Sequence, residues 1–286
     1  MQNARAYKMV EKTPFAFAAE QLLLMHPLIL PFWLAGLVHY FATPEGRRHQ
    51  LLAWIWIATF ALLATSGSAR SNYLGPAYTV LLPAGGVAFE RLARRRRWRW
   101  LPATAATLFV AGGAIGVPLA LPLLPPDRYP SYERALGIRA PVEQVDELGA
   151  MPLHFALRFG WPELRAALHQ ALATLAPPER AEAVVLGRWF GDTAVINAYR
   201  EREGFPPAIS GHNNYWIWGP GEARGEIVLA VAEDDAQLRT WFADVRRVAE
   251  VDCTLCMPNV DRLAIYACRK PLRPIREWWP EAKRFI

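Results

Sequence analysis

The stretch Arg94-Arg-Arg-Arg-Trp-Arg-Trp100 separates two apolar runs, Tyr73–Leu92 and Leu101–Leu124. Each run approaches or exceeds the ~20 residues that an α-helix needs to cross a bilayer. Short loops rich in Lys and Arg stay on the cytoplasmic side of a membrane. The second helix should therefore carry everything after Leu124 to the opposite face, and the sequence predicts a large extracytoplasmic domain.

Two earlier apolar runs, Leu22–Phe41 and Leu51–Ser66, extend this membrane region towards the N-terminus. With them, the sequence predicts an α-helical multi-pass membrane region of about four helices over residues 22–124. In residues 125–286 charged side chains are interspersed with apolar ones, as in a soluble domain. We therefore expect an external segment at 1–21, the membrane region, and an extracytoplasmic α/β domain with a helix-covered sheet.

The N-terminus conflicts with this orientation. The basic loop Pro44-Glu-Gly-Arg-Arg-His49 should be cytoplasmic, so Leu22–Phe41 should run inwards from the outside. Met1–Lys12 would then be external, although it is basic and has no apolar signal-peptide core. Because such a start is normally retained in the cytoplasm, we expect further membrane segments upstream, with this chain as the C-terminal part of a larger protein.

The formal net charge of +6 indicates an anionic partner. Five arginines lie together in residues 94–99, next to an apolar run, where lipid headgroups fit better than nucleic acid. The chain contains no glycine-rich phosphate-binding loop, and its sequence indicates no cofactor. We therefore expect membrane lipid as a partner and no nucleic acid.

The second half of the chain alternates between helical and strand periodicities. The predicted elements are a helix at Trp161–Leu175, a strand at Ala183–Phe190, a helix at Thr193–Arg202, a strand at Glu226–Ala232, a helix at Asp234–Val245, and strands at Val248–Leu255 and Leu263–Arg269 joined by a turn at Met257–Arg262. This alternation predicts a sheet covered by helices. Asp192 or Thr193 should cap the second helix, although a carboxylate that follows a strand could also bind a ligand.

The run Ile209-Ser-Gly-His-Asn-Asn-Tyr-Trp-Ile-Trp-Gly-Pro220 is the densest polar and aromatic segment of the predicted soluble domain. It combines hydrogen-bonding side chains at His212, Asn213 and Asn214 with flat aromatic faces at Tyr215, Trp216 and Trp218. Such faces can stack against sugars or lipid headgroups. The alternative is a Gly/Asn turn followed by a strand whose alternate aromatics enter the core. The polar cluster favours the binding interpretation because it adds nothing to packing.

Three cysteines, Cys253, Cys256 and Cys268, lie near the predicted C-terminal strands. A structural zinc site needs four ligands, and the chain has no second cysteine pair, so we expect no metal. A redox C-x-x-C motif would open a helix, whereas Met257-Pro258 leads into a predicted turn. In an oxidising compartment we expect one disulfide among the three cysteines, with its pairing open.

Arg70 lies at the outer end of the third predicted helix, in Ala69-Arg-Ser-Asn-Tyr-Leu-Gly-Pro-Ala-Tyr78. A guanidinium flanked by Tyr73 and Tyr78 could hold the phosphate of a lipid carrier through charge-assisted hydrogen bonds. The alternative is that the Arg70 side chain only places its guanidinium at the membrane–water interface and binds no specific ligand.

Four segments together resemble one family. They are His26–Gly36, Arg70–Tyr78, Ile209–Pro220 and Cys253–Met257. In this order and spacing they are similar to the C-terminal half of bacterial membrane glycosyltransferases related to the protein O-mannosyltransferases and the lipid A aminoarabinose transferase. The resemblance implies a C-type glycosyltransferase fold in the bacterial inner membrane. Such an enzyme moves a sugar from a polyprenyl-phosphate carrier to an extracytoplasmic acceptor, here an unknown lipid, glycan or protein.

The resemblance also implies roles for individual residues. Arg70, Tyr73 and Tyr78 match the region that faces the lipid-phosphate donor. The family's catalytic acidic residues lie in a first external loop that has no counterpart here, so we assign no catalytic residue and expect the chain alone to be inactive. Residue chemistry, and not the resemblance, selects the residues expected to contact acceptor or sugar, which are His212, Asn213, Asn214, Tyr215 and Trp218.

An alternative from a different class is a non-catalytic module for binding or assembly. In that case the membrane helices only tether a periplasmic α/β domain. The two interpretations differ in what they expect upstream of Met1. An in-frame continuation with several hydrophobic segments and an acidic first loop is expected for the glycosyltransferase, and a promoter with a stop codon is expected for the module.

Overall fold

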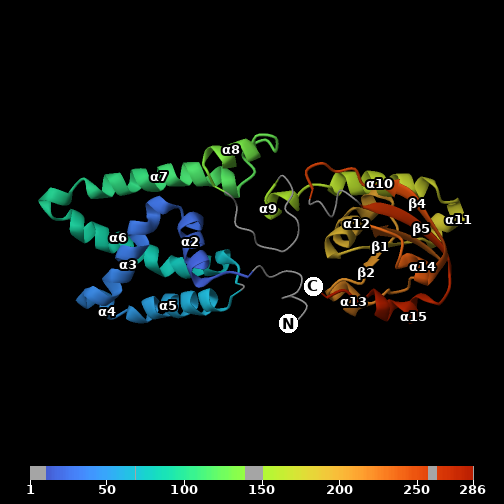
Figure 1. Cartoon of the computed structure of the whole chain (residues 1–286), viewed down its shortest axis with the longest axis horizontal. Coiled ribbons are helices and arrows are strands. Elements are labelled where there is room, and N and C mark those ends of the chain that lie inside the picture. The colour runs from blue at the N-terminus through green and yellow to red at the C-terminus, as the bar shows by residue number, and fades with distance from the viewer. Residues whose placement is uncertain (1–10, 68, 139–150, 257–262, 286) are drawn as a thin grey trace. The chain divides into compact units, whose positions relative to one another are not determined.

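The computed structural model describes residues 11–67, 69–138, 151–256 and 263–285. They fall into two compact units, with residues 11–138 in an N-terminal unit and residues 151–285 in a C-terminal unit (Figure 1). The N-terminal unit continues past the predicted boundary at Leu124. Within it, the hydroxyl of Tyr132 donates a hydrogen bond of 2.8 Å to the carbonyl of Ile115.

The N-terminal unit is helical. Its elements are α2 (Pro14–Leu24), the 3-10 helix η1 (Pro27–Ile29), α3 (Leu30–Ala42), α4 (Pro44–Arg47), α5 (Gln50–Thr65), the 3-10 helix η2 (Ser71–Val80), α6 (Leu81–Ala93), the 3-10 helix η3 (Arg96–Trp98), α7 (Leu101–Ala120) and α8 (Tyr129–Ala135). Its core is rich in aromatic side chains, with Tyr78 packed edge-on against Trp33 and Trp56.

The predicted four-helix multi-pass membrane region is wrong. Among the described residues, only the helical segment Arg96–Ala120 is by itself long and apolar enough to cross a membrane. α2 and the segment Pro27–Ala42 pass this test only together, and they are bent by 91°. α5 is apolar but has only 16 residues. The structure therefore offers one candidate span, or two if the bent pair is counted as one.

Backbone geometry explains why hydropathy overcounted the spans. The predicted helix Leu22–Phe41 breaks because His26 adopts a positive φ of 46° and is followed by Pro27, which has no amide hydrogen to donate. The predicted helix Tyr73–Leu92 is divided because its first part belongs to η2, a 3-10 helix with Pro76 inside it. A mean hydropathy reports apolar composition and does not detect these breaks.

Helices α3 and α6 approach each other backbone to backbone. A Cβ atom on Gly36 would lie 2.1 Å from the carbonyl oxygen of Leu81, and one on Gly85 would lie 2.1 Å from that of Phe32. Both positions therefore require glycine, as is common where apolar helices pack closely. This contact holds the bent segment against α6.

The C-terminal unit is built on a five-stranded mixed sheet with the order β2-β1-β3-β5-β4 (Figure 1). The strands are β1 (Val184–Gly187), β2 (Ala208–Ser210), β3 (Ile227–Ala232), β4 (Phe242–Glu250) and β5 (Ala264–Pro271). β1 runs parallel to both β2 and β3, whereas β5 runs antiparallel to β3 and β4. The carboxyl ends of β1, β2 and β3 therefore meet at one edge of the sheet.

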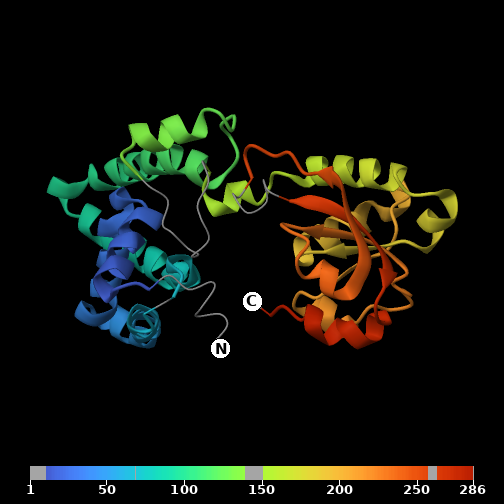
Figure 2. The ribbon, with the colours of Figure 1, turned by 45° about the vertical axis from the view of Figure 1, so that its right-hand side comes forward.

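Helices cover both faces of this sheet (Figures 1 and 2). The helices of this unit are α9 (Leu153–Ala156), α10 (Trp161–Ala173), α11 (Pro177–Glu182), α12 (Phe190–Glu203), α13 (Asn214–Trp218), α14 (Leu238–Trp241), α15 (Ile275–Trp278) and the 3-10 helix η4 (Trp279–Ala282). α10 and α12 pack on the face that carries Val185, and α14, α15 and η4 pack on the face that carries Val184 and Leu186. Successive residues of β1 thus pack into the hydrophobic clusters on opposite faces of the sheet.

The predicted helix Asp234–Val245 is mostly wrong. Only Leu238–Trp241 is helical, and the chain then enters β4 at Phe242. The buried residues Leu238, Trp241 and Val245 have the spacing of one helix face. Pairing with β5 nevertheless makes the later part a strand, with an irregularity between Arg247 and Ala249. The strand predicted at Val248–Leu255 is also largely wrong, because it overlaps only the end of β4, which runs from Phe242 to Glu250.

Asp192 and Thr193 lie inside α12, not at its N-cap. The predicted N-cap at Asp192 or Thr193 is wrong because α12 begins three residues before Thr193, with Trp189 as its N-cap. Asp192 instead lies in the first turn of the helix. The predicted turn at Met257–Arg262 lies outside the described residues.

Candidate functional site

An open pocket of about 490 Å³ lies at the carboxyl edge of the sheet, within the C-terminal unit. Its lining residues are Phe190, Asn213, Asn214, Tyr215, Trp218 and Phe285. Phe190 is the first residue of α12 after β1, and the asparagines follow β2. The pocket thus brings together four of the predicted acceptor or sugar contacts and two phenylalanines that the sequence did not single out.

A backbone bridge holds the loop that carries the asparagines. The amide of Asn213 donates to the carbonyl of Arg284 at 3.0 Å, and the amide of Arg284 donates to the carbonyl of Gly211 at 2.8 Å. A Cβ atom on Gly211 would lie 1.8 Å from the carbonyl oxygen of Ala282. Glycine is therefore needed for the C-terminal segment to approach the end of β2 and to place Phe285 in the pocket.

The aromatic residues of this segment have two different roles. Trp218 is 68% exposed and packs edge-on against Tyr215, with ring centroids 4.8 Å apart. Phe190, 45% exposed, adds a further apolar face. Trp216 turns away and exchanges two hydrogen bonds of 3.1 Å with the backbone and indole of Trp279. The helix α13 therefore anchors the indole of Trp216 to Trp279 and exposes the indole of Trp218 at the pocket. Because the segment is helical, the alternative prediction of a strand is wrong.

His212 lies behind the pocket and does not line it. Its side chain is buried, and its ring centroid is 5.4 Å from that of Phe190. Its backbone also pairs with that of Arg284. Among the predicted contacts, His212 thus supports the pocket wall, whereas Asn213, Asn214, Tyr215 and Trp218 form its surface.

A buried carboxylate, that of Asp192, follows the pocket residue Phe190 in the first turn of α12. Asp192 is buried, and its Oδ1 accepts a hydrogen bond of 2.6 Å from the indole of Trp189. The guanidinium Nε of Arg188 lies 3.9 Å from its Oδ2. Burial raises the pKa of Asp192 to about 6, against the opposing effect of Arg188. The sequence showed only that a carboxylate follows the strand, not that it is buried.

The three predicted donor residues do not form one surface. Tyr73 is exposed and Arg70 is half-buried, whereas Tyr78 is fully buried between Trp33 and Trp56. Tyr78 therefore supports the structure from inside, and only Arg70 and Tyr73 can meet a ligand at the surface.

A partly buried polar cluster fixes the segment that carries Arg70. Lys12 Nζ lies 2.6 Å from Glu20 Oε2 and donates to Ser71 Oγ at 3.3 Å. The Ser71 hydroxyl also donates to Glu20, and Gln21 Nε2 donates to the Ser71 carbonyl at 3.0 Å. These contacts join α2 to the start of η2. The sequence signal for them was weak because their partners are about 50 residues apart.

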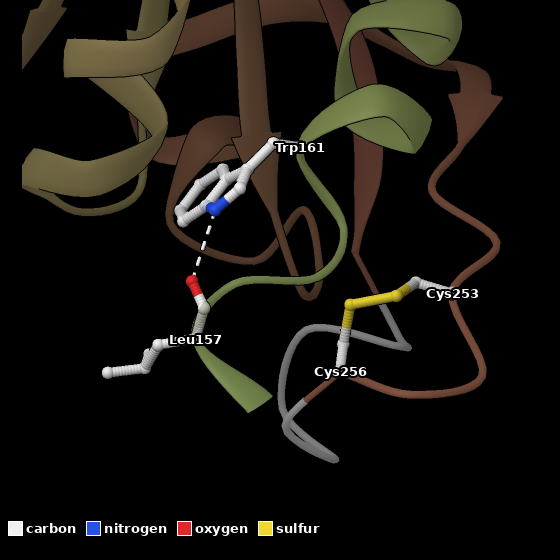
Figure 3. The surroundings of a disulfide bond; sticks show 4 residues. All are labelled: Leu157, Trp161, Cys253 and Cys256. Carbon is white, nitrogen blue, oxygen red and sulfur yellow. Dashed lines mark hydrogen bonds between the residues drawn. A yellow bond between two sulfur atoms is a disulfide. The ribbon is translucent and has the colours of Figure 1, made fainter. Parts of the chain in front are cut away.

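Cys253 and Cys256 form a disulfide, with their Cα atoms 5.7 Å apart (Figure 3). Nearby, the indole of Trp161 donates a hydrogen bond of 3.0 Å to the carbonyl of Leu157. Cys268 is a free thiol buried in β5, where burial raises its pKa to about 12. Among the described residues, no group of three or more His, Cys, Asp and Glu side chains is placed to hold a metal ion.

No family model, curated protein or solved structure matches this chain.

Proposed function

We propose that the C-terminal unit binds a sugar in the aromatic pocket, and that the chain is part of a membrane-bound glycosyltransferase that uses a polyprenyl-phosphate-linked sugar. The observation that carries the proposal is a pocket whose walls combine exposed aromatic faces with the amides of Asn213 and Asn214. The pocket is formed largely by Ile209–Pro220, one of the segments on which the family resemblance rests.

The chemistry of the lining suits a carbohydrate. One face of a pyranose ring is largely C–H, and it can lie on the exposed indole face of Trp218, with the ring of Tyr215 inclined at 65° beside it. Its hydroxyl groups both donate and accept hydrogen bonds. An asparagine amide offers a carbonyl acceptor and two donors, so Asn213 and Asn214 can satisfy hydroxyls at the edge of such a ring. An apolar floor with a few polar groups is the usual composition of a small-molecule site.

We further propose that Arg96–Ala120 crosses the bacterial inner membrane with its arginine-rich end in the cytoplasm. The positive-inside rule then makes the C-terminal unit extracytoplasmic. The Cys253–Cys256 disulfide supports this placement, because disulfides persist in oxidising compartments. The acceptor would accordingly be a lipid, glycan or protein of the cell envelope.

Replacing Trp218 with alanine tests the sugar pocket. Loss of a central aromatic anchor costs on the order of 2 kcal/mol, so sugar affinity should fall ~30-fold. The full chain in detergent micelles would be titrated calorimetrically with mono-, di- and trisaccharides of gluco, galacto and manno configuration. Ile217→Ala is a matched control, since Ile217 is an exposed neighbour in α13 that does not line the pocket. Equal affinity in Trp218→Ala and the parent would refute the pocket assignment.

Arg70, with Tyr73 beside it, is proposed to bind the donor phosphate. Losing one charge-assisted contact costs about 1.5–3 kcal/mol, so Arg70→Ala should bind a polyprenyl-phosphate sugar ~10- to 100-fold more weakly. Arg70→Lys should retain part of the affinity, because an ammonium keeps the charge without the planar fork. Binding would be measured on the full chain in lipid nanodiscs, with exposed Arg48→Ala as the control. Unchanged donor affinity in Arg70→Ala would favour a purely interfacial role for this arginine.

The alternative function is a non-catalytic, membrane-anchored binding or assembly module. It is favoured by the fact that every residue lining the pocket belongs to the C-terminal unit. Deleting the gene and analysing envelope glycans by mass spectrometry separates the two functions. A missing sugar modification supports the transferase, whereas an unchanged glycan profile supports the module.

A further inference from the structure

A second cavity, of about 230 Å³, lies at the carboxyl ends of β1 and β3. Polar and charged side chains line it, together with the apolar ends of the strands. The residues that matter for its chemistry are Arg188, Glu233, Asp234, Gln237, Trp241 and Arg284. None of them belongs to the aromatic pocket, and none was a predicted site residue.

The topology of the sheet explains why a cavity forms there. From β1 the chain passes through α12 to β2 on one side, and it then returns to β3 on the other side of β1. The strand order thus changes direction between β1 and β3. In parallel sheets a crevice opens outside the carboxyl ends at such a point, and ligands commonly bind in it.

Arg188 is held in place inside this crevice. Its side chain is only 11% exposed, and its Nη1 lies 3.0 Å from Oε1 of Glu233. Asp192 lies behind it, at 3.9 Å. The side chain of Glu233 is 50% exposed, so its carboxylate can also accept hydrogen bonds from a ligand. The crevice therefore has a fixed donor next to an accessible acceptor.

The charges of the lining are balanced. Arg188 and Arg284 supply two positive charges, and Glu233 and Asp234 supply two negative charges. An anionic ligand would meet the two carboxylates, and a cationic ligand would meet the two guanidinium groups. Hydroxyl groups both donate and accept, so a neutral polyol matches this mixture of donors and acceptors best. Trp241 adds an aromatic edge to the cavity.

The crevice and the aromatic pocket are neighbours. Three chain segments contribute a residue to each: Arg188 and Phe190, Gly211 and Asn213, Arg284 and Phe285. Residues two positions apart are separated by at most about 7 Å of chain. Gly211 and Arg284, which both line the crevice, are joined by the backbone hydrogen bond from the Arg284 amide to the Gly211 carbonyl.

From these observations we infer that the crevice is a second sugar subsite. The C-terminal unit then binds a neutral glycan of at least two sugar residues. One sugar unit lies on Trp218 beside Tyr215, and the next sugar unit is hydrogen-bonded by Arg188, Glu233 and Gln237. This inference rests on the proposed sugar binding at the aromatic pocket, and it defines the ligand as an oligosaccharide.

The test compares sugars of increasing length on the full chain in detergent micelles. The probes are the same neutral gluco, galacto and manno series, from monosaccharide to trisaccharide. In the series that binds, the disaccharide should bind at least ~10-fold more tightly than the monosaccharide, because it gains a charge-assisted hydrogen bond. Glu233→Gln should reduce disaccharide affinity ~10-fold and leave monosaccharide affinity unchanged.

Two further variants keep this test decisive. Gln237→Ala probes the crevice without disturbing Arg188, in case Glu233→Gln is poorly folded. Glu250→Gln is the control, because Glu250 also pairs with an arginine, Arg247, at 2.9 Å on the protein surface. It should bind every sugar like the parent.

The possible failures of the two proposals are distinguishable. If Trp218→Ala loses binding but mono- and disaccharides bind the parent equally, the second subsite is refuted and the aromatic pocket stands. The same conclusion follows if Glu233→Gln and Gln237→Ala both bind the disaccharide like the parent. A preference for disaccharides that carry a uronic acid would refute the neutral ligand. If no sugar binds the parent, the proposed function and the subsite both fall.

Discussion

Replacing Trp278 with alanine is expected to destabilise the C-terminal unit by about 3–5 kcal/mol, the usual cost of removing a buried aromatic side chain. Trp278 is 0% exposed and is among the largest fully buried side chains. Its ring stacks on Trp241 with centroids 4.5 Å apart and meets Phe242 edge-on at 5.8 Å. Its loss therefore opens a cavity where α14 and α15 pack on the sheet.

Thermal unfolding of the full chain in detergent micelles checks this prediction. The transition of the C-terminal unit should fall by at least about 6 °C, and amides of β3 and β5 should exchange faster with solvent. Trp218→Ala is the control, because a largely exposed side chain contributes only about ±0.5 kcal/mol. A parental transition in Trp278→Ala would show that this side chain is not part of the core.

The second large effect is a pH dependence caused by Asp192. Its pKa is about 6 in the folded protein, compared with an ordinary value of 3.8. The folded state therefore binds the proton more tightly than the unfolded state. As the pH falls below 3.8 the group becomes protonated in both states, and the cost disappears. Above pH 6 the buried carboxylate costs about 3 kcal/mol, at 1.36 kcal/mol for each pKa unit.

Asp192→Asn should remove this cost. The amide oxygen can still accept the hydrogen bond from the indole of Trp189. At pH 7.5 the variant should be more stable than the parent by as much as about 3 kcal/mol, and the two should converge as the pH falls to 4. Melting temperatures measured between pH 4 and 8 would show this. Asp252→Asn, at an exposed position, is the control. A constant difference between parent and Asp192→Asn across this range would contradict the assignment.

Local patterns in the sequence predicted several parts of the C-terminal unit. The helix predicted at Trp161–Leu175 is present as α10, and the strand predicted at Glu226–Ala232 is present as β3. Both carry apolar residues with the period of their own element, so their burial follows from their order in the chain. The run at Ile209–Pro220 was likewise recognisable as a candidate site, because it combines the polar side chains of Asn213 and Asn214 with several aromatic rings.

Long-range contacts decided where the local patterns were ambiguous. Residues after Leu238 have the spacing of a helix face, but hydrogen bonds to β5 form a strand from Phe242 onward. Phe285 enters the pocket only because the end of the chain pairs with Gly211, about 70 residues earlier. Similarly, the buried carboxylate of Asp192 becomes unusual only after packing removes it from water.

Local sequence was enough to recognise the apolar N-terminal half, the arginine-rich loop, the alternation of helices and strands in the second half, and the aromatic segment that forms the pocket. These features depend on residues close together in the chain, so composition and period are enough to recognise most of them; the exception is the start of β4, which has the spacing of a helix face. Three features became known only from the folded chain: how many apolar segments are long straight helices, which cysteines pair, and which side chains line the two cavities. Those outcomes depend on backbone breaks at His26 and Pro76, and on contacts between distant residues such as Gly211 and Arg284. Contacts between residues that are far apart in the chain cannot be recognised from the residues around either partner alone.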